Sequence, residues 1–270
     1  MDIVPFAIAF GAAVAAGGIN AIAGGGTLIT YPTLNLLIGL PGKMANATNT
    51  MALWPASLVA AHGFKQAVPF SRSTVLAFCA TSAFGALTGA TLLKYTAEAQ
   101  YEQIVPWLIL MAAMLFLLQE SILRNLSKNT NPTPKESPGD EPNMESRNGH
   151  SVAAALVFQF FVGVYGGYFG AGIGIIMLAA LSFVKAGDIY QMSYLKNLGA
   201  MCINGLATIL FGAWGMVEWR YAIVMASGAM LGGFLGTVFG KKIGPKALRL
   251  IISLIGCAIA LKMLLSVRQH

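Results

Sequence analysis

The first forty residues contain an apolar stretch that is long enough to cross a membrane and is interrupted by glycine. The stretch runs from Ile3 to Leu40 and contains the sequence GGINAIAGGGT at residues 17–27. Each glycine in a helix interior costs about 1 kcal/mol relative to alanine. A backbone that leaves the helix inside a bilayer must still bond its polar groups, so it is tolerated only beside protein or a water-filled cavity. The interruption therefore predicts a cavity within a membrane-spanning fold.

A second glycine-rich interruption lies in the other half of the chain, where residues 163–174 read GVYGGYFGAGIG. Paired interruptions of this kind, at corresponding positions of two halves, indicate the substrate site of a transporter. The alternative is that the glycines only allow membrane helices to pack closely.

The composition supports an all-α polytopic membrane protein. Charged residues make up only 10% of the 270 residues, against about 25% in soluble proteins, and the mean hydropathy is +0.69. The net charge of +7 is assigned to loops flanking the membrane spans rather than to nucleic-acid binding. Asp2 precedes the first apolar run without any Lys or Arg, so we expect that run to be a membrane element of the mature protein.

Ten helical segments are predicted from the apolar runs and the turns between them. They cover residues 3–23, 27–40, 45–64, 73–93, 103–123, 151–170, 172–184, 188–212, 219–240 and 247–265. The polar, proline-containing stretch at 124–150 predicts a flexible linker. The chain therefore divides into an N-terminal membrane repeat at 1–123, the linker at 124–150 and a C-terminal membrane repeat at 151–270.

The two halves are related by an internal duplication. One offset of 147 residues aligns many of their small and polar positions: Ser57 with Asn204, Gly85 with Gly232, Gly89 with Gly236, and Thr48-Asn49-Thr50 with Leu195-Lys196-Asn197. If each half crosses the membrane an odd number of times, twelve of the 17 basic residues fall on one side and five on the other. Because positive residues concentrate in cytoplasmic loops, this count predicts inverted repeats of about five segments each. The linker is then cytoplasmic and both termini lie outside.

The polar residues inside the membrane favour an anionic substrate. The acidic residues all fall near segment ends or in the linker, whereas cation sites usually need carboxylates. Helix N-termini beside a glycine break, asparagine amides and one lysine suit an anion. The predicted substrate site consists of Asn20, Gly24, Gly25, Gly26, Thr27, Asn46, Asn49, Thr50, Gly170, Gly172, Lys196 and Asn197.

Other chemistry receives less support. Lys196 could instead extend to the interface as a helix-end lysine, and His62 could carry a proton but is more often structural. No catalytic motif and no Walker sequence occurs, so we expect a non-enzyme without cofactors and without its own ATP drive. Cys79, Cys202 and Cys257 have no metal-ligand spacing, so no metal site is predicted and the three are interpreted as reduced core residues.

The sequence GGINAIAGGGTL at residues 17–28, Pro32, Ala47-Thr48-Asn49-Thr50 and Leu195-Lys196-Asn197 resemble the TauE/SafE sulfite exporter family of the four-toluene-sulfonate-uptake permease superfamily. The resemblance covers the chain outside the linker. It departs at Thr50, where many members carry lysine, and at Gly170-Ala171-Gly172, which is not a run of three glycines. The resemblance implies a bacterial inner-membrane permease for sulfite or an organosulfonate.

An export mechanism follows as a hypothesis. An anion leaving a cell that is negative inside gains about 2.3 kcal/mol per charge per 100 mV. The two inverted halves would rock around a midplane site to give alternating access. The alternatives are an anion channel, a permease for carboxylates or other anions, and a non-transporting assembly or sensor protein. Partners are the anion and the bilayer, and self-association into a homo-oligomer is left open.

Overall fold

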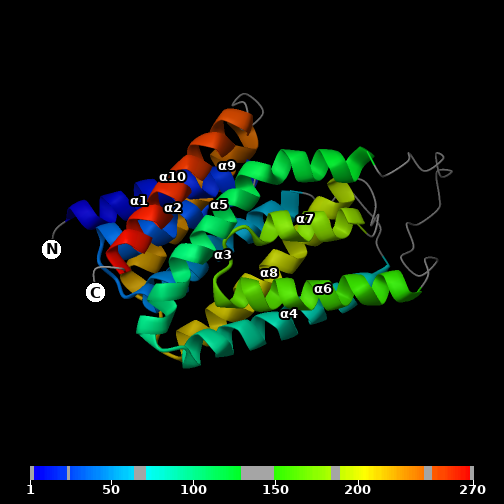
Figure 1. Cartoon of the computed structure of the whole chain (residues 1–270), viewed down its shortest axis with the longest axis horizontal. Coiled ribbons are helices and arrows are strands. Elements are labelled where there is room, and N and C mark those ends of the chain that lie inside the picture. The colour runs from blue at the N-terminus through cyan, green and yellow to red at the C-terminus, as the bar shows by residue number, and fades with distance from the viewer. Residues whose placement is uncertain are drawn as a thin grey trace.

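The computed structural model describes residues 3–22, 25–63, 71–128, 149–183, 189–239 and 245–267. Over these ranges the protein is a bundle of helices without strands (Figure 1). Four of these helices contain stretches long and apolar enough to cross a membrane: Ile3–Asn20, Arg72–Tyr95, Glu98–Ser121 and Tyr194–Ala213. Large apolar side chains such as Leu76, Phe84 and Trp107 are exposed on the outer surface, as lipid contact requires. The predicted all-α polytopic membrane fold is confirmed.

The helices lie close to the predicted segments. In the first half they are α1 (Ile3–Ile22), α2 (Thr27–Pro32), the π-helix η1 (Thr33–Leu37), α3 (Gly42–Gly63), α4 (Arg72–Tyr95) and α5 (Glu98–Lys128). In the second half they are α6 (Gly149–Tyr168), α7 (Ile173–Phe183), α8 (Ile189–Ala213), α9 (Trp219–Phe239) and α10 (Pro245–Val267).

The predicted segment at 27–40 is the one that differs most in form. Pro32 has no backbone N–H to donate, and directly after it the chain changes to the wider π-helix, in which the Ile38 N–H donates to the Thr33 carbonyl. This element ends at Leu37, and Ile38–Pro41 connect it to α3. The connection expected between the predicted segments 73–93 and 103–123 is also shorter, because α4 extends to Tyr95 and α5 begins at Glu98.

Most of the glycines in the two glycine-rich stretches pack helices together rather than break them. Gly17 lies within α1, and a Cβ there would be 2.1 Å from the Ala229 carbonyl oxygen of α9. Gly167 lies within α6, where a Cβ would be 2.4 Å from the Ala86 carbonyl oxygen of α4. The close-packing interpretation therefore holds for these positions. Among the described residues of the two stretches, the helix is interrupted at 25–26 and at 169–172.

The main helix contacts join one half of the chain to the other. α1 packs on α9, and α6 packs on α4; α3 contacts both α8 and α9, while α8 contacts both α3 and α4. The same pattern results if each helix of one half is exchanged for its counterpart in the other. Corresponding helices also start 146 or 147 residues apart. This is the arrangement that a duplication would produce, and the duplication itself stays a prediction.

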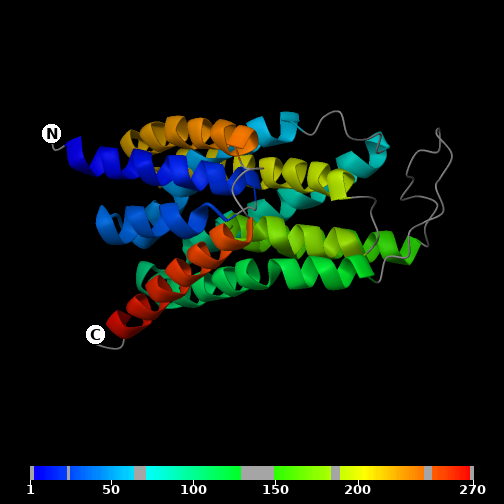
Figure 2. The ribbon, with the colours of Figure 1, turned by 90° about the horizontal axis from the view of Figure 1, so that it is seen from above.

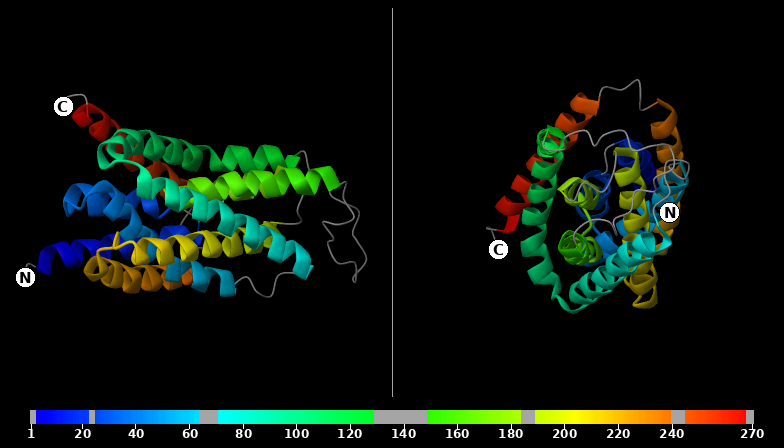
Figure 3. Two further views of the ribbon diagram at one scale, coloured as in Figure 1. Left: turned by 90° about the horizontal axis from the view of Figure 1, so that it is seen from below. Right: turned by 90° about the vertical axis from the view of Figure 1, so that its right-hand side faces the viewer.

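The first helices of the two halves, α1 and α6, run in opposite directions. In Figure 2, α1 starts at the end marked N and runs to the middle, whereas α6 starts at the opposite end and also runs to the middle. Both termini lie at the same end of the molecule (Figure 3). An inverted repeat requires this geometry, and it brings the two interruptions together at the centre of the bundle.

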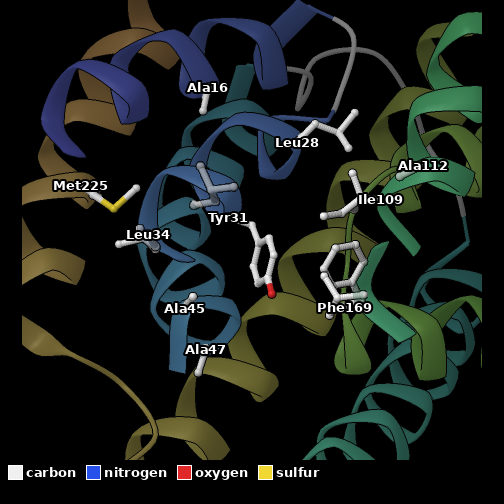
Figure 4. Close-up of a cluster of buried hydrophobic side chains, with 14 of the residues drawn as sticks. Ala16, Leu28, Tyr31, Leu34, Ala45, Ala47, Ile109, Ala112, Phe169 and Met225 are labelled. Carbon is white, nitrogen blue, oxygen red and sulfur yellow. The ribbon is translucent and has the colours of Figure 1, made fainter. Parts of the chain in front are cut away.

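A buried apolar cluster surrounds the centre. Tyr31 and Phe169 meet there edge to face, with ring centroids 5.5 Å apart, among Leu28, Leu34 and Ile109 (Figure 4). Tyr31 comes from the first interrupted element and Phe169 from the second, so this packing holds the two interruptions against each other.

Candidate functional site

A cavity of about 60 Å³ lies between the two interruptions, which is enough for a few water molecules or a small ion. Half of its sixteen lining residues have polar side chains and a quarter are glycines. The lining consists of Asn20, Gly25, Thr27, Asn49, Thr50, Leu53, Ser57, Phe169, Gly170, Gly172, Ile173, Gly174, Lys196, Asn197, Ala200 and Asn204. It is therefore a polar cavity in the interior of an apolar bundle.

Nine of the twelve predicted site residues line this cavity: Asn20, Gly25, Thr27, Asn49, Thr50, Gly170, Gly172, Lys196 and Asn197. Gly24 lies outside the described residues. Gly26 and Asn46 are not part of the lining. Gly26 is pressed against α1, where a Cβ would be 2.7 Å from the Ala16 carbonyl oxygen. The Asn46 side-chain amide instead donates to the Tyr168 carbonyl at 2.9 Å.

The first interruption is held by hydrogen bonds from side chains. Gly25 has a φ of +115°, a conformation that side chains disfavour, and its N–H donates to Asn20 Oδ1 at 3.3 Å. The buried Asn49 of α3 accepts a hydrogen bond from the Thr30 hydroxyl and donates from Nδ2 to Thr27 Oγ1 at 3.4 Å. The start of α2 is thus fixed to α3 by one asparagine.

The second interruption is a tight turn built on two glycines. Gly170 and Gly172 have φ values of +81° and +77°, and the Tyr165 hydroxyl donates to the Ala171 carbonyl at 2.7 Å. α7 begins directly after this turn, and Gly172, Ile173 and Gly174 all line the cavity. The N–H groups of a first helical turn have no partner within the helix and carry the positive end of its dipole. The start of α7 is therefore suited to a negatively charged group.

The lining is nearly symmetric with respect to the two halves. Twelve of the sixteen residues form pairs separated by 147 positions: Gly25 with Gly172, Thr27 with Gly174, Asn49 with Lys196, Thr50 with Asn197, Leu53 with Ala200, and Ser57 with Asn204. Equivalent positions of α3 and α8 consequently face the same space. The offset of the sequence comparison reappears in the geometry of the cavity.

Lys196 is the one cation among the lining residues, and the lining contains no carboxylate. The lysine stem lies against the start of α7, since a Cβ on Gly174 would be 3.4 Å from Lys196 Cδ. Within the described part of the chain, Lys196 forms neither a hydrogen bond nor an ion pair. Its ammonium group is available to a ligand, and the described structure does not place it on an exposed helix end.

The sequence did not single out seven lining residues for the site: Leu53, Ser57, Phe169, Ile173, Gly174, Ala200 and Asn204. A signal existed for two of them, because Ser57 and Asn204 occupy equivalent positions of the two halves. Helical spacing also relates Ser57 to Thr50 and Leu53, which share its face of α3. Phe169, Ile173 and Gly174 belong to the second glycine-rich stretch, whereas Leu53 and Ala200 are apolar helix residues that only the folded chain brings to the cavity.

Alternative chemistries find no site in the described part of the protein. No group of three or more histidine, cysteine, aspartate or glutamate side chains there could hold a metal ion. The three cysteines are half-buried free thiols, on α4, α8 and α10. The side chain of His62 lies outside the described residues.

The chain is similar in sequence to several probable membrane transporter proteins. The chain is 27% identical over 265 residues to the probable membrane transporter protein ORF9 of Sinorhizobium sp., covering 96% of this chain and 92% of that protein. It is 28% identical to the probable membrane transporter protein YfcA of Escherichia coli K12, over 95% of this chain and 88% of the relative. A probable membrane transporter protein of Haemophilus influenzae is 29% identical, over 95% of this chain and 93% of that protein.

No solved structure matches the chain. Residues 9–263, which include both interruptions and every residue of the cavity lining, match the family described as sulfite exporter TauE/SafE. The protein is therefore a membrane transporter of the TauE/SafE family.

Proposed function

We propose that the protein moves a small sulfur oxyanion, sulfite or an organosulfonate, across the bacterial inner membrane, and that the cavity is its binding site. The observation that carries this proposal is Lys196, a cation without a partner in a lining that has no carboxylate. A charge inside a membrane protein is costly and is retained mainly where it serves function. An oxyanion would supply the missing counter-charge.

The remaining lining supplies the hydrogen bonds that an oxyanion loses when it leaves water. Asn20, Asn197 and Asn204 carry side-chain amides that can donate, and the start of α7 presents backbone N–H groups. The small volume of about 60 Å³ favours a compact anion or the head group of a sulfonate. The absence of a nearby carboxylate in the lining also favours an ionised oxyanion over a cation.

We further propose that transport is export by alternating access. The inverted halves would rock about the central cavity, opening it to each side in turn. The asymmetry of the basic residues supports a cytoplasmic linker with both termini outside. Export then follows the membrane potential, so no coupled ion is needed.

The test is anion uptake into proteoliposomes that contain the purified protein, with a potassium diffusion potential of either sign. We expect saturable uptake of radiolabelled sulfite that follows the potential and disappears in Lys196→Met. Lys262→Met is the matched control, because Lys262 is exposed on α10. Uptake that does not saturate and shows no exchange would indicate a channel. Sulfite uptake no faster than in empty liposomes, followed by failure of a sulfonate and carboxylate panel, would contradict the proposal.

A further inference from the structure

Aromatic side chains close one side of the cavity. Phe169 lines the cavity and meets the ring of Tyr31 edge to face at 5.5 Å. The phenol of Tyr31 neighbours that of Tyr101, and the Tyr101 ring lies 5.8 Å from the ring of Tyr168. We name Tyr31, Tyr101, Tyr168 and Phe169 the aromatic plug. Figure 4 shows Tyr31 and Phe169 in contact at the centre of the apolar cluster.

A second, more open pocket of about 260 Å³ lies near Tyr101 of the plug. Its lining includes Lys43, Lys94, Glu98 and Trp214. It adjoins the plug directly, since a Cβ on Gly42 would be 3.1 Å from the Tyr101 ring and 3.2 Å from Glu98 Oε1. The junction of α4 and α5, which contributes to this pocket, lies at the end of the molecule that holds both termini (Figure 3). The plug therefore separates the cavity from a vestibule at that end.

The plug and the adjoining Asn46 contain polar groups whose hydrogen-bonding capacity is not met. Asn46 is buried and its Nδ2 donates to the Tyr168 carbonyl, but its Oδ1 has no hydrogen-bond partner in the described structure. The hydroxyls of Tyr31 and Tyr101 are also buried, and no described group outside this pair bonds to either of them. Buried polar groups without partners are costly. Apolar side chains of the same shape would avoid that cost if the plug were only core.

We propose that the aromatic plug is the gate of the transport path on the side of the termini, and that this structure shows it closed. Opening would separate Tyr31 and Tyr101 and expose Asn46 Oδ1 and the two hydroxyls, so that water or the passing anion becomes their partner. The cavity and the vestibule would then form one path. The gate rests on the proposed transport function, although its motion can be measured without any substrate.

The first test compares the double variant Tyr31→Phe/Tyr101→Phe with the natural protein. Removal of the two hydroxyls keeps the packing of the closed plug but takes away its polar lining in the open state. We expect a melting temperature that is unchanged or higher, sulfite binding within a factor of about two, and uptake about tenfold slower, equivalent to about 1.4 kcal/mol in the barrier. Tyr221→Phe, which affects a tyrosine stacked on Phe6, should transport normally. A double variant with normal uptake would overturn the gate.

The second test measures the opening directly and separates the two proposals. A cysteine replaces Ala45, a fully buried residue of α3 that shares a helix face with Gly42 and Asn49, after alanine has replaced the three native cysteines. In lipid nanodiscs without anion, we expect a charged thiol reagent to label Ala45→Cys and to label it several-fold more slowly in the Tyr31→Phe/Tyr101→Phe background. Ala113→Cys, equally buried between α5 and α10, is the control.

The outcomes are distinct. Labelling at position 45 without sulfite uptake would support the gate and contradict the proposed substrate. Sulfite uptake with position 45 as inert as position 113 would support transport and overturn the gate.

Discussion

Asn49 of α3 and Lys196 of α8 line the same cavity from equivalent positions, 147 residues apart. Asn49 is bonded to Thr27 and Thr30 and so holds the start of α2. Lys196 has no partner in the described structure and only lies along the start of α7. Of these two equivalent residues, Asn49 therefore stabilises the fold, whereas Lys196 presents a positive charge to a ligand.

Replacement of Lys196 by methionine should raise the melting temperature while abolishing anion binding. Removing an unpaired charge from a partly buried site inside the bundle relieves its desolvation cost, and methionine retains most of the side-chain volume. Thermal unfolding in detergent, with and without sulfite, measures both effects. The control, Lys262→Met, should change neither quantity. A lower melting temperature for Lys196→Met would mean that the lysine has a structural role instead.

Asn49→Ala should destabilise the protein by about 1–3 kcal/mol, because it leaves buried hydroxyls of α2 without their partner. The start of α2 would then lose its attachment to α3, so anion binding should fall as well. The control is Asn35→Ala, which removes a bond from Asn35 to the Leu40 carbonyl outside the cavity. Unfolding and sulfite-binding titrations should show that Asn35→Ala loses stability but still binds sulfite normally. Full binding by Asn49→Ala would exclude this coupling.

Gly172→Ala should abolish transport at a modest cost in stability. The position has a φ of +77°, and its nearest neighbour to an added Cβ is 3.7 Å away, so backbone strain of about 1–2 kcal/mol is the main penalty. Gly39→Ala has the same strain, at a φ of +83° with open space around it, but Gly39 lines neither the cavity nor the vestibule. We expect the two variants to have equal melting temperatures and only Gly172→Ala to lose transport. Transport lost in both variants would assign the effect to strain.

Gly232→Ala should destabilise the contact between α1 and α9 by about 3 kcal/mol or more, because an added Cβ would be 1.9 Å from the Val14 carbonyl oxygen and the backbones must separate. Gly11→Ala is the control on the same pair of helices, since nothing lies within 4 Å of its Cβ position. It should be neutral or stabilising by about 0.5–1 kcal/mol. Size-exclusion profiles and thermal unfolding in detergent would reveal the difference. A stable Gly232→Ala variant would contradict this packing.

Much of the fold followed from local patterns. Apolar runs of membrane length and the turns between them predicted the helix ends to within five residues. The largest differences are at α5, which is longer than expected at both ends, and after Pro32, where the segment ends as a π-helix. The glycine interruptions and the intramembrane asparagines and lysine predicted most of the cavity lining. These features can be predicted because the bilayer disfavours unpaired backbone groups and unpaired charges. A glycine interruption or a polar residue within an apolar segment therefore indicates a functional or structural role.

The sequence by itself determined an all-helical membrane protein with two interruptions at its centre and one intramembrane lysine near them. Only the tertiary structure decided which glycines pack and which turn, because that depends on the neighbours: Gly17 meets the Ala229 carbonyl of α9, whereas Gly25 meets the Phe116 ring of α5. It also decided that Tyr31 and Phe169, 138 residues apart, pack edge to face beside the cavity. Contacts between distant residues depend on how whole helices pack against one another. The residue pattern within one helix does not specify which other helix it will contact.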